Sequence, residues 1–178
     1  MKRLLCVLLC LCLCSCCLAE ETAEGTDHLI VDDAMGIGYL LSDRWHGVEI
    51  SEADAAAGIC AMYTAEDGSL LAISLAGALD EDGQPLTEPE ALAELYRSAE
   101  LEPELLENGA VLIALPEQDA LIATILNGQG MAVSFAFMPA GEETVAEAAD
   151  TTIRSITLLP EEETTEPATT EDIPEGGA

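Results

Sequence analysis

Two histidines, His28 and His46, and one cysteine, Cys60, are the residues of this sequence best suited to nucleophilic or general-base chemistry. A cysteine becomes a nucleophile when a histidine lies within hydrogen-bond reach of its thiol. His46 follows Trp45 in an apolar segment, so their side chains should point to opposite faces of a strand, with Trp45 inside and His46 on the surface. Cys60 lies within an apolar run and is expected to be a small buried residue. The serines lack a Gly-x-Ser-x-Gly setting, so the sequence predicts no catalytic residue and no enzyme.

Metal-ligating patterns are equally scarce. Residues 80–83 read Asp-Glu-Asp-Gly and resemble part of a calcium loop, because Ca²⁺ prefers several oxygen ligands on a tight turn. The full EF-hand pattern needs acids at the positions that Ala78 and Pro89 occupy, so it fails. Cys60 has neither a cysteine neighbour nor a histidine cluster, which excludes the usual zinc spacing, and no glycine-rich phosphate loop is present. The sequence predicts no metal site and no cofactor, with a loose cation site at 80–83 left as an alternative.

The net charge of the chain limits the classes of molecule that it can bind. The chain has 5 Lys and Arg against 35 Asp and Glu. Two of the basic residues, Lys2 and Arg3, lie at the extreme N-terminus, so without that segment 3 basic residues stand against 35 acidic ones, a net charge of −32. Such a charge repels nucleic acids and anionic membrane surfaces. It leaves a protein or a cell-envelope component as the expected partner, and an acidic cation-binding protein as one alternative function.

The N-terminal segment has the pattern of a secretory signal peptide. Met1-Lys2-Arg3 is a charged start, and the ten apolar residues 4–13 are too few to span a membrane comfortably. Cleavage after Ala19 would make residues 1–19 the signal peptide. Alternatively, Leu-Cys-Ser-Cys at 13–16 resembles a lipobox, in which Cys16 would be lipidated and become the new N-terminus. Both routes predict an extracytoplasmic protein without a transmembrane helix in the mature chain. Six of the seven cysteines lie in this segment, so the body of the chain cannot form an intrachain disulfide.

Residues 28–159 are expected to form one domain, between a flexible leader at 20–27 and a disordered acidic tail at 160–178. Apolar runs separated by turn residues predict the strands, at 28–31, 37–41, 45–50, 59–64, 70–75, 110–115, 120–126 and 131–138, with a further partner at 104–107. Asn108-Gly109 predicts a type I′ hairpin turn. Two helices are predicted, one from a Thr87–Glu90 capping box to about residue 100, the other at 142–155. Ser51 should cap a shorter helical turn.

The alternation of large and small side chains along residues 131–138 predicts which face of this strand lies in the core. Val133, Phe135 and Phe137 share one face and carry the bulk, so this face should be covered by helices, whereas Ser134 should lie on the other face. The facing helix residues are expected to be Leu92, Leu95 and Tyr96 from one helix and Val145, Ala149 and Ile153 from the other. Trp45 should be at least partly buried beside them.

The element order resembles the Mog1/PsbP-like family of small exported bacterial proteins. The resemblance rests on the strand pair MGIGYLLSDRWHGVEI, the hairpin and helix that follow, the NGA hairpin, two long strands and a last helix ending TIRSI. The usual Pro-x-Gly-Trp turn is Ser42-Asp43-Arg44-Trp45 here. The resemblance implies an α+β fold, an antiparallel sheet of about six to eight strands with two main helices packed on it. It also implies an accessory or binding role without catalysis. An extracytoplasmic hydrolase that gathers His46 or Cys60 with acids remains the other alternative.

Overall fold

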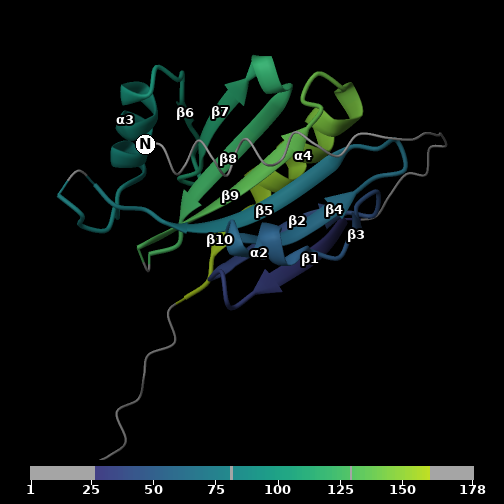
Figure 1. Cartoon of the computed structure of the whole chain (residues 1–178), viewed down its shortest axis with the longest axis horizontal. Helices are drawn as coiled ribbons and strands as arrows, with labels where there is room; N and C mark the ends of the chain where they lie inside the picture. The colour runs from purple at the N-terminus through teal and green to yellow at the C-terminus, as the bar shows by residue number, and fades with distance from the viewer. Residues whose placement is uncertain (1–26, 81, 129, 161–178) are drawn as a thin grey trace, which may run out of the picture.

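Two antiparallel β-sheets form the frame of the protein in the computed structural model, which describes residues 27–80, 82–128 and 130–160. The larger sheet has seven strands in the order β3-β4-β5-β9-β8-β7-β6 (Figure 1). In chain order these strands are β3 (His46–Gly47), β4 (Ile59–Thr64), β5 (Leu70–Gly77), β6 (Glu104–Leu105), β7 (Val111–Leu115), β8 (Ala120–Leu126) and β9 (Met131–Met138).

A second sheet, which the sequence did not predict as a separate unit, has three strands in the order β1-β2-β10. They are β1 (Asp27–Asp32), β2 (Ile37–Ser42) and β10 (Thr157–Leu158). The last strand therefore returns to pair with the second, and this brings the two ends of the domain together. The predicted α+β class and antiparallel sheet are confirmed, and the larger sheet has a strand number within the predicted range.

Two main helices were predicted, and both are present. They are α3 (Pro89–Ser98) and α4 (Glu143–Ser155), accompanied by the short α2 (Glu52–Ala56) and the 3₁₀ turn η2 (Pro116–Gln118). The Ser51 cap is confirmed, because its hydroxyl accepts a hydrogen bond from the Asp54 amide. The Thr87 cap is wrong. Glu88 precedes the first helical residue and its side chain makes no capping bond. Pro89 starts the helix instead, since its fixed φ suits the first turn.

The two helices pack on opposite faces of the larger sheet, and each face has its own apolar cluster. On the α4 face, Val133, Phe135 and Phe137 lie beneath Val145, Ala149 and Ile153, together with β2. On the α3 face, Leu92 and Tyr96 pack on β7 and β8, and Leu95 is partly buried beside them. The predicted register of β9 and the burial of Trp45 are confirmed. The two helix stripes, however, do not meet in one core.

Aromatic rings join the small sheet to the larger one. Tyr39 of β2 meets Phe135 of β9 edge-on, with ring centroids 5.0 Å apart. The ring of Trp45, which follows β2, has its centroid 6.2 Å from that of Phe137. Edge-on aromatic pairs contribute about 0.5–1.5 kcal/mol beyond the area that they bury. The small sheet and α4 thus form one layer over the same face.

Two local predictions differ from the structure. In the Asn108-Gly109 turn, only Gly109 has a positive φ, of 83°. Its amide bonds to the Leu106 carbonyl, and the Leu106 amide bonds to the Ala110 carbonyl, a longer hairpin connection than a type I′ turn. The third predicted strand, 45–50, is shortened to β3 (His46–Gly47).

The remaining predictions concern the two ends of the chain and a transmembrane helix. The first strand begins at Asp27, the last residue of the expected leader. The predicted signal peptide, the Cys16 lipidation site and the tail beyond Pro160 lie outside the described residues. Within the ranges that the structure describes, no helix is long and apolar enough to cross a membrane.

Candidate functional site

The structure does not bring Cys60 and His46 together. His46 lies in β3 directly opposite Thr64 of β4. Cys60 stands four residues before Thr64 on the same strand, which separates it from His46 by roughly 13 Å at the rise of a β-strand. A hydrogen bond between the thiol and the imidazole needs contact within about 3.2 Å. The Cys60–His46 nucleophile pair is therefore not formed.

Cys60 is exposed, contrary to the prediction that it is buried. The pairing of β4 with β5 shifts register between Ile59 and Ala61, and such a bulge breaks the alternation of inward and outward side chains. The Cys60 thiol lies 3.5 Å from the Gly58 carbonyl oxygen, to which it donates. Partial burial raises the pKa of Cys60. The thiolate is therefore a minor form at neutral pH, which makes this cysteine a poor nucleophile.

The imidazole of the other histidine, His28, contacts the Asp43 carboxylate. His28 lies in β1 and Asp43 lies in the turn after β2, so the pair closes one end of the β1–β2 hairpin. His46 is exposed, as predicted. Both histidines thus stand on the surface, in different sheets.

The acidic loop at 80–83 is organised by its own backbone. One oxygen of the Asp80 carboxylate accepts hydrogen bonds from the amides of Asp82 and Gln84, at 2.9 and 2.7 Å. This is the geometry of an Asx turn, which uses the carboxylate to hold the loop. Glu81 lies outside the described residues. Among those described, no group of three or more histidine, cysteine or acidic side chains could hold a metal ion.

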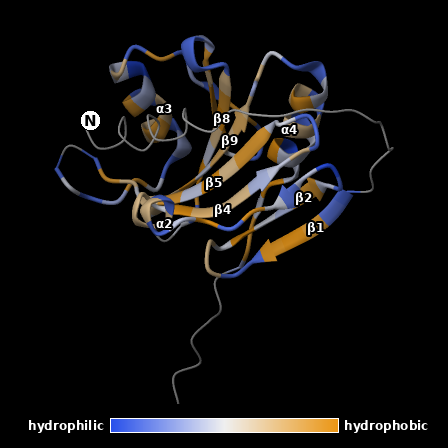
Figure 2. Cartoon of the chain, turned by 45° about the vertical axis from the view of Figure 1, so that its right-hand side comes forward, coloured by the Kyte–Doolittle hydropathy of each residue, from blue (hydrophilic) through white to orange (hydrophobic). Residues whose placement is uncertain are grey.

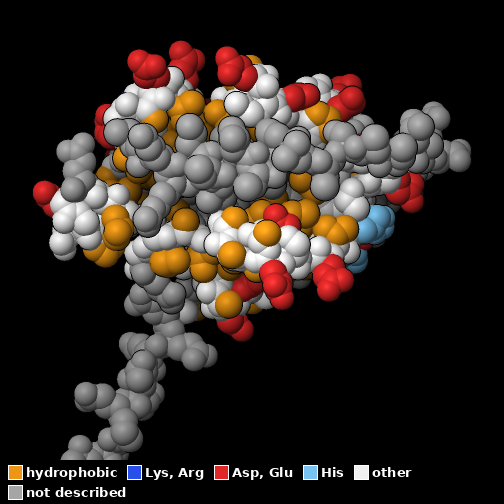
Figure 3. Space-filling model, viewed as in Figure 1, with side chains coloured by type: hydrophobic (Ala, Val, Ile, Leu, Met, Phe, Trp, Pro, Cys, Tyr) orange, Lys and Arg blue, Asp and Glu red, His pale blue; other side chains and the backbone are white. Residues whose placement is uncertain are grey.

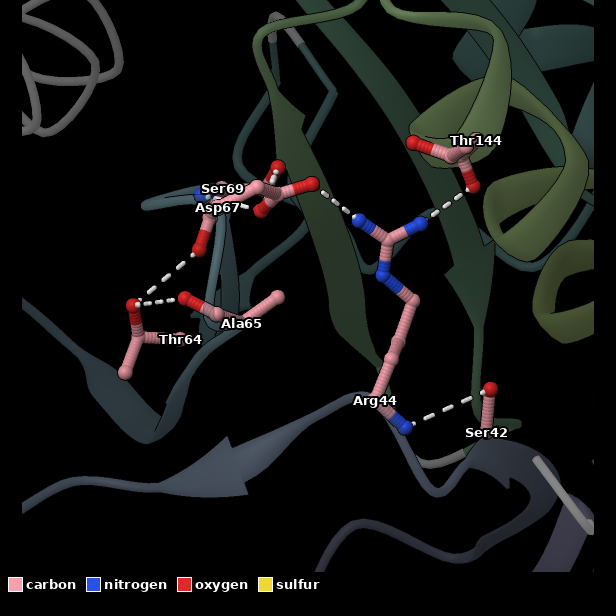
Figure 4. Close-up of polar contacts among 7 residues, drawn as sticks. All are labelled: Ser42, Arg44, Thr64, Ala65, Asp67, Ser69 and Thr144. Atoms are coloured by element: carbon pink, nitrogen blue, oxygen red, sulfur yellow. Dashed lines mark hydrogen bonds and ion pairs between the residues drawn. The ribbon is translucent and has the colours of Figure 1, made fainter. Parts of the chain in front are cut away.

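Arg44 makes polar contacts with residues from several elements, and Figure 4 shows them. Its guanidinium donates to the Thr144 carbonyl at the start of α4 and to the Asp67 carboxylate in the β4–β5 turn, each at 2.6 Å. It also lies 5.3 Å from the centre of the Trp45 ring. Arg44 therefore ties the turn after β2 to both layers of the domain.

Asp67 is held by more than the arginine. Its carboxylate also accepts from the Ser69 amide and hydroxyl, at 2.9 and 2.6 Å. Partial burial raises the pKa of Asp67, but the hydrogen bonds from Ser69 and the charge of Arg44 outweigh it and hold the pKa below its usual value. Arg44 and Ser69 thus hold this carboxylate in the β4–β5 turn, which is the arrangement of a structural contact between the two layers.

A chain of hydroxyl groups crosses the α3 face of the larger sheet. The Tyr96 hydroxyl lies 2.8 Å from the Thr124 hydroxyl, which lies 2.9 Å from that of Ser134. Ser134 pairs in turn with Ser74 of β5. Burial raises the pKa of Tyr96, although its bond to Thr124 opposes the shift. A neutral phenol buried against other hydroxyls orders the helix on the sheet, and supplies no acid or base near neutral pH.

A shallow depression of about 350 Å³ lies where the NGA hairpin meets the end of α4, lined by Leu106, Glu107, Asn108 and Arg154. Two of its three polar side chains make contacts within the protein. The Asn108 amide donates to the carbonyls of Ile153 and Ile156, and Arg154 pairs with Asp150. The Asn108 side chain therefore caps the C-terminus of α4.

The outer edge of β1 is the feature that the protein's own contacts leave open. Leu29 and Val31 are 66% and 55% exposed, the two largest values among the large apolar side chains described. Both lie on the same face of the small sheet, because they are two residues apart on one strand. In Figure 2, β1 forms the lower margin of the domain, and its apolar residues lie along the edge. No described strand pairs with that edge.

Acidic groups surround this edge. Asp27 begins β1, Asp32 ends it, and Asp33 follows. On the face seen in Figure 3, acidic side chains gather along the rim, and none of the visible side chains that the structure describes is a lysine or an arginine. The three arginines described each pair with an acid of the chain itself. The surroundings of β1 are therefore strongly negative.

Sequence reasoning placed the β1 strand but missed its exposure. The pattern Asp-His-Leu-Ile-Val-Asp has no clear two-residue alternation, so it does not say which face is inside. The aspartates at both ends were the available signal, because charged residues often bracket an apolar edge strand. The role of Arg44 depends on Thr144, a hundred residues away, and no local pattern reveals it.

Comparisons with known proteins bear on the fold. No protein-family model and no curated protein matches the sequence. Among solved structures, the chain is similar to the solution structure of cyanobacterial PsbP (CyanoP) from Synechocystis sp. PCC 6803. The match has 15% sequence identity and a TM-score of 0.48, and covers 82% of this chain and 98% of the other. The matched protein is a PsbP, one of the two proteins after which the resembled fold group is named. What the protein does has to be argued from its own residues.

Proposed function

We propose that this chain is an exported binding protein that holds a protein partner at or outside the cell envelope and acts without catalysis. The observation that carries the proposal is the open edge of β1, where Leu29 and Val31 expose 66% and 55% of their surface. Covering such side chains contributes about 25 cal/mol for each Å² of apolar surface removed from water. A partner that covers them is therefore favoured.

The N-terminal sequence supports the location. A charged start followed by ten apolar residues is typical of a secretory signal peptide. Mass spectrometry of the native protein tests it. A chain that begins at Glu20 indicates simple secretion, and a lipidated N-terminal Cys16 indicates a lipoprotein. An intact Met1 on a cytoplasmic protein would contradict export by either route.

Photo-cross-linking in the producing cells tests the binding role. A photoreactive phenylalanine analogue replaces Leu29 in one variant and the exposed Glu147 of α4 in a matched control. We expect a discrete adduct with an envelope protein from position 29 and none from position 147. Equal labelling at both positions, or no adduct at position 29, would contradict the proposal.

A further inference from the structure

We propose that β1 is a docking edge at which a basic, extended protein segment adds as a fourth strand to the small sheet. This inference rests on the proposed binding function and specifies the chemistry of the partner. Strand addition of this kind obtains affinity from main-chain hydrogen bonds and specificity from alternate side chains. The open edge must therefore have unpaired backbone groups and exposed side chains that a partner strand can contact.

The backbone of β1 supplies the hydrogen bonds. The Leu40 amide of β2 donates to the Ser155 hydroxyl at 2.7 Å, on the side of β2 that faces away from β1. The pair that Leu40 forms with Leu29 is therefore one that exchanges no ladder hydrogen bonds. Because such pairs alternate along an antiparallel ladder, the N–H and C=O groups of both Leu29 and Val31 point outward. The outward backbone groups thus belong to the same two residues whose side chains are exposed.

The other sheet edges are shorter. The larger sheet ends on β3 and β6, and the small sheet ends on β10 at its other side, each with two residues. Very short edge strands are a common protection against unwanted pairing. β1 has six residues, so among the described edges it alone offers several successive outward groups.

The charge around β1 selects a basic occupant. Asp27 and Asp33 flank the apolar pair, and the sequence beyond the N-terminal segment carries 3 basic against 35 acidic residues. A second copy of the chain is disfavoured for the same reason. If two β1 strands paired antiparallel through their outward groups, with Ile30 opposite Ile30, Asp27 would face Asp33 of the other copy at both ends. Like charges placed directly opposite destabilise a strand pair.

The test uses a defined probe, the acetylated and amidated heptapeptide Lys-Val-Lys-Val-Lys-Val-Lys. It is added to the full chain, purified as the expressing cell processes it. We expect the amide resonances of Leu29 and Val31 to shift and their hydrogen exchange to slow. A Lys-Gly peptide of equal charge, which lacks β-branched residues, should bind about tenfold more weakly or worse. Equal binding by the Lys-Gly peptide, or shifts that map to another surface, would overturn the proposal.

Two matched variants separate the backbone from the side chain. Val31→Pro removes an outward N–H and leaves the β1–β2 ladder intact, because proline is tolerated on a strand edge. Val31→Thr keeps both the N–H and the β preference. We expect Val31→Pro to weaken peptide binding about tenfold or more, and Val31→Thr to change it by less than about threefold. Equal binding by Val31→Pro and the parent chain would contradict strand addition.

If circular dichroism shows that Val31→Pro is unfolded, a second peptide tests whether binding occurs by strand addition. A Lys-Val peptide methylated on every internal backbone nitrogen cannot donate to β1 from either edge, and we expect it to bind at least about tenfold more weakly than the parent peptide. Binding of this peptide as tight as that of the parent peptide would overturn the proposal.

The outcomes of these experiments also separate the proposed strand addition from the proposed binding function. A partner that cross-links at position 29 but still binds Val31→Pro leaves the binding role standing without strand addition. Specific peptide pairing at β1 without any cellular adduct refutes the binding role alone.

Discussion

The two faces of the larger sheet reach similar burial by different means. On the α4 face, one row across the sheet reads Ile73, Phe135 and Ala123. The neighbouring row on the α3 face reads Ser74, Ser134 and Thr124. The Thr124 hydroxyl bonds to those of Ser134 and Tyr96. The first face is stabilised by contacts between aromatic rings, whereas the second combines mainly aliphatic residues with hydrogen bonds between hydroxyl groups. The comparison teaches that the free energy of unfolding should depend unequally on the two faces.

The largest expected effect is on the α4 face. Phe135→Ala removes a fully buried ring that contacts Tyr39 edge-on. We expect a loss of about 3–5 kcal/mol in the free energy of unfolding, measured by urea denaturation, because truncation leaves a cavity. For a domain this size such a loss could abolish folding. A loss below about 1 kcal/mol would show that the aromatic layer is not what holds this face.

A smaller effect is expected from the α3 face. Leu92→Ala truncates a buried residue of α3 that packs on β7 and β8. We expect a loss of about 2–3 kcal/mol, within the range for buried leucine and below that for Phe135. The same urea titration measures it. If Leu92→Ala costs more than Phe135→Ala, the ranking of the two faces is reversed.

The ion pair between Arg44 and Asp67 should contribute less to the free energy of unfolding, and its contribution should depend on pH. Asp67→Asn removes the charge that meets Arg44 and should cost about 1 kcal/mol at pH 7, since the pair is partly exposed and screened by solvent. Folding holds the pKa of Asp67 below its usual value of 3.8. The stabilisation is therefore present above that pH and is lost as the pH falls through the lowered pKa.

Unfolding curves of the parent chain and Asp67→Asn at a series of pH values measure this dependence. The difference between the two should be constant near neutral pH and should shrink below about pH 4. Asp150→Asn, at an exposed pair on α4, is the matched control and should change stability by no more than about 0.5 kcal/mol. A difference for Asp67→Asn that stays constant down to pH 2 would show that its charge is not involved.

The smallest effect is expected at Ser134, on the α3 face. Ser134→Ala removes one hydroxyl contact, but Thr124 keeps its bond to Tyr96. We expect a loss of about 0.5 kcal/mol in thermal or urea unfolding. A loss above about 2 kcal/mol would show that the hydroxyl chain acts as a unit, and that the two faces differ less than their residues suggest.

Much of this contrast could be predicted from the sequence. Strands β4, β8 and β9 have the predicted bounds, because their apolar runs end at turn residues. The face assignment of Phe135 followed from alternation, and the buried residues of α4 followed from helical spacing. Local patterns of this kind report on local structure and on which face is apolar.

What could not be predicted depends on contacts between distant segments. Helices α3 and α4 have similar apolar stripes, and nothing in a stripe says which face of a sheet it covers. The separate small sheet depends on Thr157 and Leu158 returning to β2. The exposure of Cys60 depends on a bulge in β4. The open edge of β1 follows from the topology, since a strand is an edge only when its neighbours are known.

The burial of Trp45 gives the protein an optical reporter of its own. It is the only tryptophan of the chain, and it lies beside Phe137 with the guanidinium of Arg44 over its ring. Excitation at the red edge of the absorption band therefore selects one indole in one environment. Its emission should be blue-shifted in the folded protein and should move to longer wavelength when the joint between the two sheets opens. Each unfolding experiment above can thus be followed without an added dye, at the point where the layers of the domain meet.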